Sequence, residues 1–143
     1  GGGKIGQVID SGTSPDAVII GSASFVALTD GTTALAASIT PSATSSSVLM
    51  MVSIMSYCGA DDGYGVSLRR GGVEFYASAS DYEIFNNNAS SNYSRSFWMA
   101  LDTGISTTSA TEYTVYVKTY DGHDVTFQRT ENDSKIILME VLA

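Results

Sequence analysis

The chain has 143 residues, of which 43% are hydrophobic and 15% are charged, and its formal net charge is −8 at pH 7. This length predicts a single domain over residues 1–143 that folds without a metal or a disulfide, after a flexible glycine-rich start at residues 1–4. The acidic balance argues against nucleic-acid binding and against an anionic membrane surface, and no apolar run approaches the roughly 18 residues of a membrane span.

The pattern of the chain favours strands over helices. No long segment shows a helical period, because Gly, Ser, Thr and Asn interrupt every apolar run. Short runs rich in Val, Ile, Thr, Tyr and Phe recur between these interruptions, which is typical of strands separated by turns. In chain order we expect strands over residues 5–9, 17–20, 25–28, 35–40, 48–57, 65–70, 73–78, 95–101, 112–119, 124–129 and 134–142.

The turns between these strands have a physical basis in the sequence. Asp30-Gly31 and Asp121-Gly122 supply positions that tolerate positive φ, and residues 69–73 read as a hairpin turn. Pro41 ends the strand before it, because proline cannot donate to a sheet. Many short antiparallel strands in one chain predict an all-β fold, a single jelly-roll-like antiparallel β-sandwich.

Two strands are apolar at nearly every position. Residues 48–55 and 136–142 lack the alternation of apolar and polar side chains that a half-exposed strand shows, so we expect both of their faces to be covered. The core of one small domain covers one face only. A second copy of the same chain is the simplest cover for the other, which predicts a symmetric assembly.

The longest stretch without a strand pattern is 79–94, and it is rich in Tyr, Asn and Ser. These residue types are used by recognition loops, because tyrosine gives rigid contact area and Asn and Ser give adaptable hydrogen bonds. A solvated connection that happens to carry aromatic residues is an equally good interpretation.

Most catalytic templates are missing. The single cysteine, Cys58, reads as a small buried hydrophobe, and the single histidine, His123, lies in a predicted turn. We therefore expect no enzyme, no cofactor and no metal site of His and Cys. Carboxylates in the turns leave two weaker options open, a glycosidase-like pair and a loop that binds Ca²⁺. The residues concerned are Asp61, Asp62, Asp81, Glu83, Asp121 and Asp124.

Several segments resemble a known family. They are residues 4–9, 35–49, 66–71, 99–104 and 134–141, and the most specific are 39–49 and the close Leu138-Met139-Glu140. Their order resembles the small jelly-roll domains of tail-fibre and appendage proteins from tailed bacteriophages, especially marine and cyanobacterial ones. The chain departs from that pattern at Thr103-Gly104, where the family usually has a proline after the Leu-Asp pair.

The resemblance implies a virion-exposed, extracellular knob or fibre module that forms a homotrimer, similar to the TNF/C1q-like architecture. Its implied partners are other copies of itself, other virion fibre or tail proteins, and a glycan or protein of the bacterial surface. In such knobs the sheet near the first and last strands faces the threefold axis. A slip of one residue exchanges the faces of a strand, so either the following residues or their alternate-face neighbours are expected in the contact: Ile5, Val8, Met51, Ile137, Met139 and Val141.

Receptor contact is expected from the loops 58–64, 79–94 and 119–124, because aromatic faces stack on sugar rings and Asn or Asp binds hydroxyls. Trp98 fits the core better than this surface. Two alternatives stay open: a fibre or decoration subunit without receptor binding, and a small polysaccharide hydrolase that uses the region of Asp81 and Glu83. The candidate receptor residues are Tyr64, Asp81, Tyr82, Phe85, Asn87, Asn92 and Tyr93.

Overall fold

The computed structural model describes residues 3–10, 12–88, 90–128 and 134–143, so the expectations for residues 1–2 and 129 lie outside it. One short 3-10 helix, η1 (Tyr120–Gly122), accompanies the strands, and no described helix is long and apolar enough to cross a membrane. The strands are β1 (Lys4–Ile9), β2 (Val18–Ile20), β3 (Val26–Ala27), β4 (Ala36–Ile39), β5 (Ser47–Cys58), β6 (Asp62–Arg70), β7 (Val73–Ala77), β8 (Ile84–Asn86), β9 (Asn92–Asp102), β10 (Thr111–Thr119), β11 (Val125–Phe127) and β12 (Lys135–Leu142).

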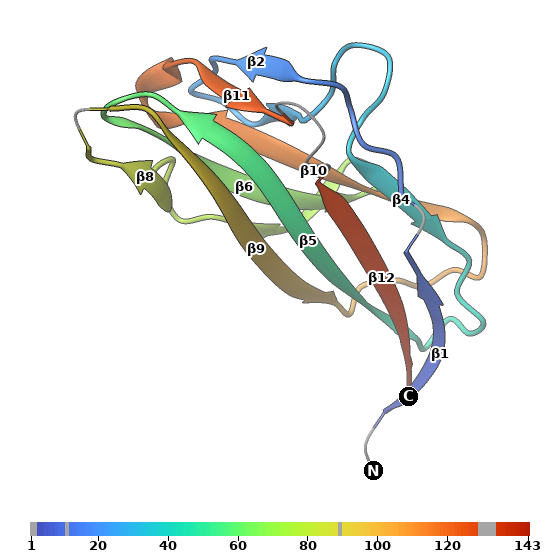
Figure 1. The fold of residues 1–143 in the computed structure, drawn as a ribbon. Coiled ribbons are helices and arrows are strands. Elements are labelled where there is room, and N and C mark those ends of the chain that lie inside the picture. The colour runs from blue at the N-terminus through green and yellow to red at the C-terminus, as the bar shows by residue number, and fades with distance from the viewer. Residues whose placement is uncertain (1–2, 11, 89, 129–133) are drawn as a thin grey trace.

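The strands form two antiparallel sheets that pack face to face. Sheet A has the order β1-β12-β5-β11-β2, and β9 pairs with β5 along its other edge. Sheet B has the order β3-β10-β6-β7, with β4 on β10 and β8 on β6. Figure 1 shows β9, β5, β12 and β1 side by side in front of sheet B. The predicted all-β antiparallel sandwich is confirmed.

Strand β5 shows how one apolar run serves two faces. Burial alternates along all 12 of its residues, with every second side chain in the core and the others half-buried on the outer face. The inner side chains join one core with those of β12 and sheet B, among them Met50, Ile54, Leu138, Leu68 and Val115. In a single chain, therefore, only the inner face of β5 is covered, whereas we expected both of its faces to be covered.

An ion pair between the partly buried Arg70 and the buried Asp102 links the two sheets. Asp102 at the end of β9 accepts hydrogen bonds from Nη1 of Arg70 in β6, at 2.7 and 2.8 Å. It also accepts one at 2.8 Å from the hydroxyl of Tyr113 in β10. Burial of Tyr113, together with its hydrogen bond to Asp102, raises the pKa of the phenol well above its usual range, so this hydroxyl remains a donor.

The predicted turns adopt the expected backbone. Gly31 has φ of 96°, and Asp121 and Gly122 have φ of 48° and 76°. One prediction needs correction: the expected loop 79–94 contains strand β8 and the first residues of β9, and β6 begins at Asp62 rather than at residue 65. The three residues of β8 are extended because they pair with the start of β6, a tertiary contact that local sequence does not encode.

The two ends of the sandwich differ. At one end the start of β1 pairs with the end of β12, with Lys4 opposite Leu142. At the opposite end lie η1, β8 and the turn between β5 and β6 (Figure 1). The three loops that the sequence analysis named therefore gather away from the chain termini.

Candidate interaction surfaces

The outer face of sheet A is apolar across four strands. Two cross-strand rows form it: Leu101, Leu49, Met139 and Val8 lie opposite one another in turn, and Met99, Met51 and Ile137 form the next row. On the edge strand β9 the exposure is high, at 77% for Phe97 and 66% for Met99. Exposed apolar side chains are common singly on soluble proteins, but a contiguous patch of this kind marks an interaction surface.

A hollow lies within this outer face. Its volume is about 470 Å³, and Phe97 and Met99 of β9 and Met51 of β5 form much of its wall. Ile137 and Lys135 line the side formed by β12. The hollow is apolar, and it is large enough to receive an aromatic side chain of a partner.

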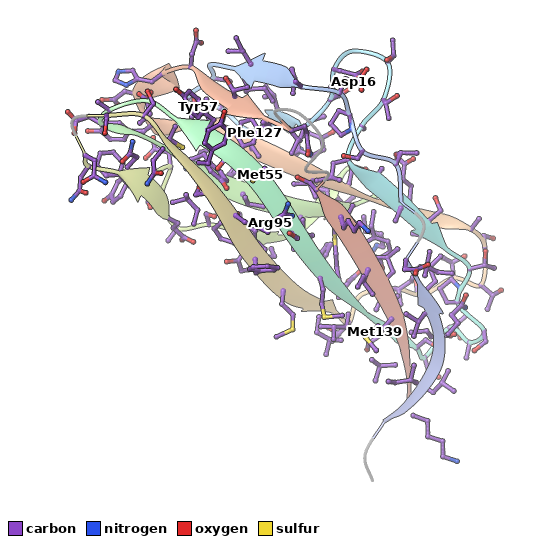
Figure 2. The ribbon with its side chains drawn as sticks, in the orientation of Figure 1. Asp16, Met55, Tyr57, Arg95, Phe127 and Met139 are labelled. Atoms are coloured by element: carbon purple, nitrogen blue, oxygen red, sulfur yellow. The ribbon has the colours of Figure 1, made fainter. Side chains whose placement is uncertain are left out.

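The outer face of sheet A becomes polar toward the end of the sandwich where the three loops gather, which we call the loop end. Figure 2 shows Met139 on β12 far from Arg95, Met55 and Tyr57, which lie further along β9 and β5. Arg95 Nη1 donates to Ser53 Oγ at 2.8 Å. The rings of Tyr57 and Tyr93 pack with their centroids 4.7 Å apart.

The outer face of sheet B has the opposite character. Arg69 lies 3.8 Å from Glu74 and places its guanidinium 4.0 Å from the centre of the Tyr116 ring. Lys118 covers the ring of Phe25 at 5.0 Å. Charged side chains thus lie over Tyr116 and Phe25 on sheet B, whereas Phe97 on the outer face of sheet A is largely exposed.

All six residues expected in a subunit contact lie on the outer face of sheet A. Ile5 and Val8 are more than half exposed. They lie opposite Val141 and Met139 in the register of β1 with β12, and residues directly opposite each other share a face. The remaining two, Met51 and Ile137, are neighbours on β5 and β12. The structure shows which of the two alternate sets of residues faces outward, a choice that the sequence left open. The contact between subunits stays a prediction.

At the loop end, the loops 79–94 and 119–124 bring four rings together, which we call the ring cluster: Tyr82, Phe85, Tyr120 and His123. The centroids of Phe85 and Tyr120 are 5.3 Å apart, and those of Tyr82 and Tyr120 are 6.0 Å apart, all edge to face. His123 packs against Tyr120 at 5.8 Å. Tyr82 and Phe85 are 56% and 42% exposed, so much of the ring cluster faces solvent.

The loops that carry the ring cluster are rich in acidic residues. Asp62 Oδ1 lies 2.9 Å from Nδ1 of His123. Residues 58–64, 79–94 and 119–124 contain six carboxylates and no Lys or Arg, so these loops carry most of the chain's net charge of −8. Among the described residues, no three His, Cys, Asp or Glu side chains gather closely enough to hold a metal ion. The carboxylates are Asp61, Asp62, Asp81, Glu83, Asp121 and Asp124.

An amide-lined hollow of about 110 Å³ adjoins Phe85. Asn86 is buried and structural, because its Nδ2 donates to the carbonyl oxygens of Cys58, Gly59 and Ser90. The exposed side chains of Asn87, Asn88 and Asn92 contribute to the wall with Ser94. This hollow offers hydrogen-bond donors and acceptors beside an aromatic ring.

The predicted receptor residues separate into three groups. Tyr82, Phe85, Asn87 and Asn92 lie around the ring cluster and the amide-lined hollow, and Asp81 adjoins Tyr82 in sequence. Tyr93 lies instead on the outer face of sheet A, opposite Tyr57.

Tyr64 is a wrong assignment. It is fully buried because β6 already begins at Asp62, so the residue faces inward, and its hydroxyl lies 2.7 Å from Ser96 Oγ. Burial raises the pKa of Tyr64 to about 12. Tyr120 was missed as a contact residue, although it stands in the loop 119–124 that the sequence analysis named.

Two further assignments concern the core. Trp98 is 9% exposed, and its Nε1 donates to Ser96 Oγ, so its predicted place in the core is confirmed. Cys58 is buried, and burial raises the pKa of its thiol to about 11. The thiol therefore stays protonated at neutral pH, which matches the interpretation of Cys58 as a buried hydrophobe.

Comparison with known proteins gives a likeness of fold. No family model matches the chain, and no curated protein matches it. A chain from the structure of infectious bursal disease virus, Gx strain, superposes with a TM-score of 0.50 at 11% identity over 98% of this chain. This chain spans 32% of that viral chain. Latent PorU from Porphyromonas gingivalis gives a TM-score of 0.36 at 11% identity, over 99% of this chain and 14% of its own.

Proposed function

We propose that the chain is a structural module of a virion, a tail-fibre or appendage domain of a tailed bacteriophage. In this proposal it forms a homotrimer through the outer face of sheet A and displays its loop end to the envelope of the host bacterium. The apolar outer face of sheet A is the observation that carries the proposal. The resemblance of segments such as 39–49 to phage appendage domains, and the fold shared with a chain of a virus structure, support it.

Self-assembly through the outer face of sheet A is favoured energetically. Burying apolar surface contributes about 25 cal/mol per Å², and Phe97, Met99 and Leu101 are each about half exposed or more in the single chain. Every other copy of the chain presents the same apolar face, so the partner is present at the concentration of the chain itself. A symmetric assembly would cover the two apolar rows and leave the charged outer face of sheet B in solvent.

The native mass in solution tests the assembly, by light scattering coupled to size exclusion at several protein concentrations. We expect a mass three times that of the 15.0 kDa chain for the wild type. Met139→Asp should dissociate it, because the variant places a charge in the apolar contact. The matched control is Val73→Asp, an exposed apolar residue on β7 of sheet B, which should keep the trimer. A wild-type monomer at all concentrations contradicts the proposal.

The receptor-binding part of the proposal concerns the loop end. The loops lie opposite the paired ends of β1 and β12, so attachment to other fibre or tail proteins at that end leaves them free (Figure 1). Adsorption of labelled protein to host cells tests this part. Tyr82→Ala with Tyr120→Ala should abolish adsorption and preserve the trimer, and wild-type adsorption in this double variant contradicts it.

Two other functions give different results in the same preparation. A fibre or decoration subunit without receptor binding would form the trimer and show no adsorption. A polysaccharide hydrolase would release reducing ends from host capsule or exopolysaccharide, and Asp81→Asn would abolish that release. In the structure Glu83 Oε1 accepts a hydrogen bond from the backbone N of Ala79 at 2.9 Å, so one carboxylate of this region is engaged in holding its own loop.

A further inference from the structure

The loop end combines two features that attract the same kind of ligand. Its three loops, residues 58–64, 79–94 and 119–124, contain six carboxylates and no Lys or Arg. The faces of aromatic rings carry partial negative charge, and Tyr82 and Phe85 are about half exposed. Carboxylates and ring faces both stabilise a cation, so the chemistry of this end favours a positively charged partner.

The geometry favours an organic cation over a metal ion. A metal ion needs several carboxylate or imidazole groups converging on one point, and no such group of three is found among the described residues. The six carboxylates instead lie at separate positions in the loops of this end, and Asp62 is paired with His123. An extended ligand with its charge distributed over several amines fits this arrangement, because each amine can meet a different carboxylate.

The amide-lined hollow indicates what else the ligand carries. Asn87, Asn88 and Asn92 contribute to its wall beside Phe85, and none of these side chains is charged. Amide groups both donate and accept hydrogen bonds, which suits hydroxyl groups. An apolar ring face next to such amides accommodates the CH face of a sugar while its hydroxyls are bound at the side.

We propose that the loop end binds a glycan that carries protonated amino groups. The ring cluster stacks on the sugar rings, the amide-lined hollow binds hydroxyls, and the carboxylates of the loops pair with the ammonium groups. This inference deepens the receptor-binding part of the proposed function and rests on it. It adds a chemical class to the receptor, a free-amine sugar as opposed to a neutral or acidic one.

Two matched oligosaccharides test it by titration calorimetry. The first is a β-1,4-linked glucosamine hexamer with free amines, and the second is its fully N-acetylated counterpart, measured at pH 6 where the amines are protonated. We expect the free-amine hexamer to bind about tenfold tighter or more, and added salt to weaken it, because the distinguishing contacts are ionic. Equal affinity for the two hexamers, or no binding of the free-amine hexamer, overturns the inference.

A peptide of six lysines separates sugar recognition from plain charge attraction. With its N-terminus acetylated, it carries the same number of amines without sugar rings, so we expect it to bind more weakly than the free-amine hexamer. A lysine peptide that binds as tightly overturns the assignment of a glycan.

The backbone conformation of the loops decides which carboxylates can be replaced without strain. Asp61 and Asp121 have φ of 58° and 48°, and asparagine accepts this left-handed conformation at least as well as aspartate. Asp61→Asn with Asp121→Asn thus removes two charges without straining the chain. This double variant should weaken the binding of the free-amine hexamer and leave the binding of the N-acetylated hexamer unchanged. Glu112→Gln, an exposed acid of β10 in sheet B, is the control and should change neither.

The outcomes also separate this inference from the proposed function. Adsorption to host cells that is insensitive to competing free-amine hexamer would preserve the receptor-binding function and overturn the glycan class. Loss of trimer in the native-mass measurement would affect the assembly proposal alone.

Discussion

Glu140 of β12 and Ser42 of the connection between β4 and β5 are joined by two hydrogen bonds to one carboxylate oxygen. Oε1 of Glu140 accepts from the backbone N of Ser42 at 2.6 Å and from its Oγ at 2.8 Å. Ser46 Oγ donates to the same oxygen at 2.7 Å, and Gln7 of β1 donates to Oε2 at 3.1 Å. Glu140 is 1% exposed, so this carboxylate fixes β1 and the segment before β5 against β12. The sheet that carries the proposed contact is thereby held in shape.

Replacing Glu140 by glutamine should destabilise the fold. The amide keeps the shape but loses the negative charge, and it presents donors where Ser42 and Ser46 also donate. We expect a loss of about 2 kcal/mol in the free energy of unfolding, a typical value for charge-assisted hydrogen bonds to a buried group. Urea denaturation at pH 7 measures it. Glu112→Gln, an exposed strand residue, is the control and should stay within about 0.5 kcal/mol of the wild type.

The same carboxylate predicts how stability depends on pH. Burial alone would raise the pKa of Glu140, but the hydrogen bonds from Gln7, Ser46 and Ser42 outweigh it and lower the pKa to about 2. A folded-state pKa below the ordinary 4.5 means that the stabilisation is complete above about pH 4.5 and is lost as the pH falls toward 2. The difference in melting temperature between the wild type and Glu140→Gln should therefore narrow between pH 5 and pH 2.5. A difference in melting temperature that stays constant over this range would contradict the assignment of this pH dependence to Glu140.

Removing the charge of Asp102 should be more costly, because its partner is partly buried. Asp102→Asn leaves Arg70 without its carboxylate between the two sheets, and breaking such a pair costs about 3 to 5 kcal/mol. Tyr113→Phe removes one hydrogen bond to the same carboxylate and should cost about 1 kcal/mol. Urea denaturation of both variants measures the order. A Tyr113→Phe variant that is less stable than Asp102→Asn would show that the phenol, not the ion pair, links the sheets.

The architecture could be predicted from the sequence because its signals are local. The Asp121-Gly122 turn and the apolar runs near Val52 and Leu138 read directly as turns and strands, and the sandwich follows from their number. Tyr64 and strand β8 could not be predicted. The first is buried because β6 extends to Asp62, and the second is extended because it pairs with that same segment. Both depend on contacts between residues 20 or more positions apart.

The candidate surfaces were predicted unevenly for a related reason. The six contact residues were named as one of two alternate sets, since β5 is apolar at nearly all positions and only the packed sheet decides which side faces in. The loops were named from their composition, which pointed to Tyr82 and Phe85. Tyr120 joins them only because η1 places its ring against Phe85. The Tyr93 ring was assigned to the same surface, but the strand register places it on sheet A.

Met50 and Met51 are neighbours on β5 that should respond differently to the same change. Met50 is fully buried between the sheets, and Met51 lies on the outer face between Met99 and Ile137. Met50→Ala leaves a cavity in the core and should lower the free energy of unfolding by about 2 to 5 kcal/mol at every protein concentration. Met51→Ala removes contact area from the proposed interface, so its effect should appear mainly as dissociation on dilution. Urea denaturation and native mass, each measured over a hundredfold range of concentration, distinguish them. If Met51→Ala leaves the native mass unchanged on dilution, the apolar rows of sheet A do not hold the assembly together.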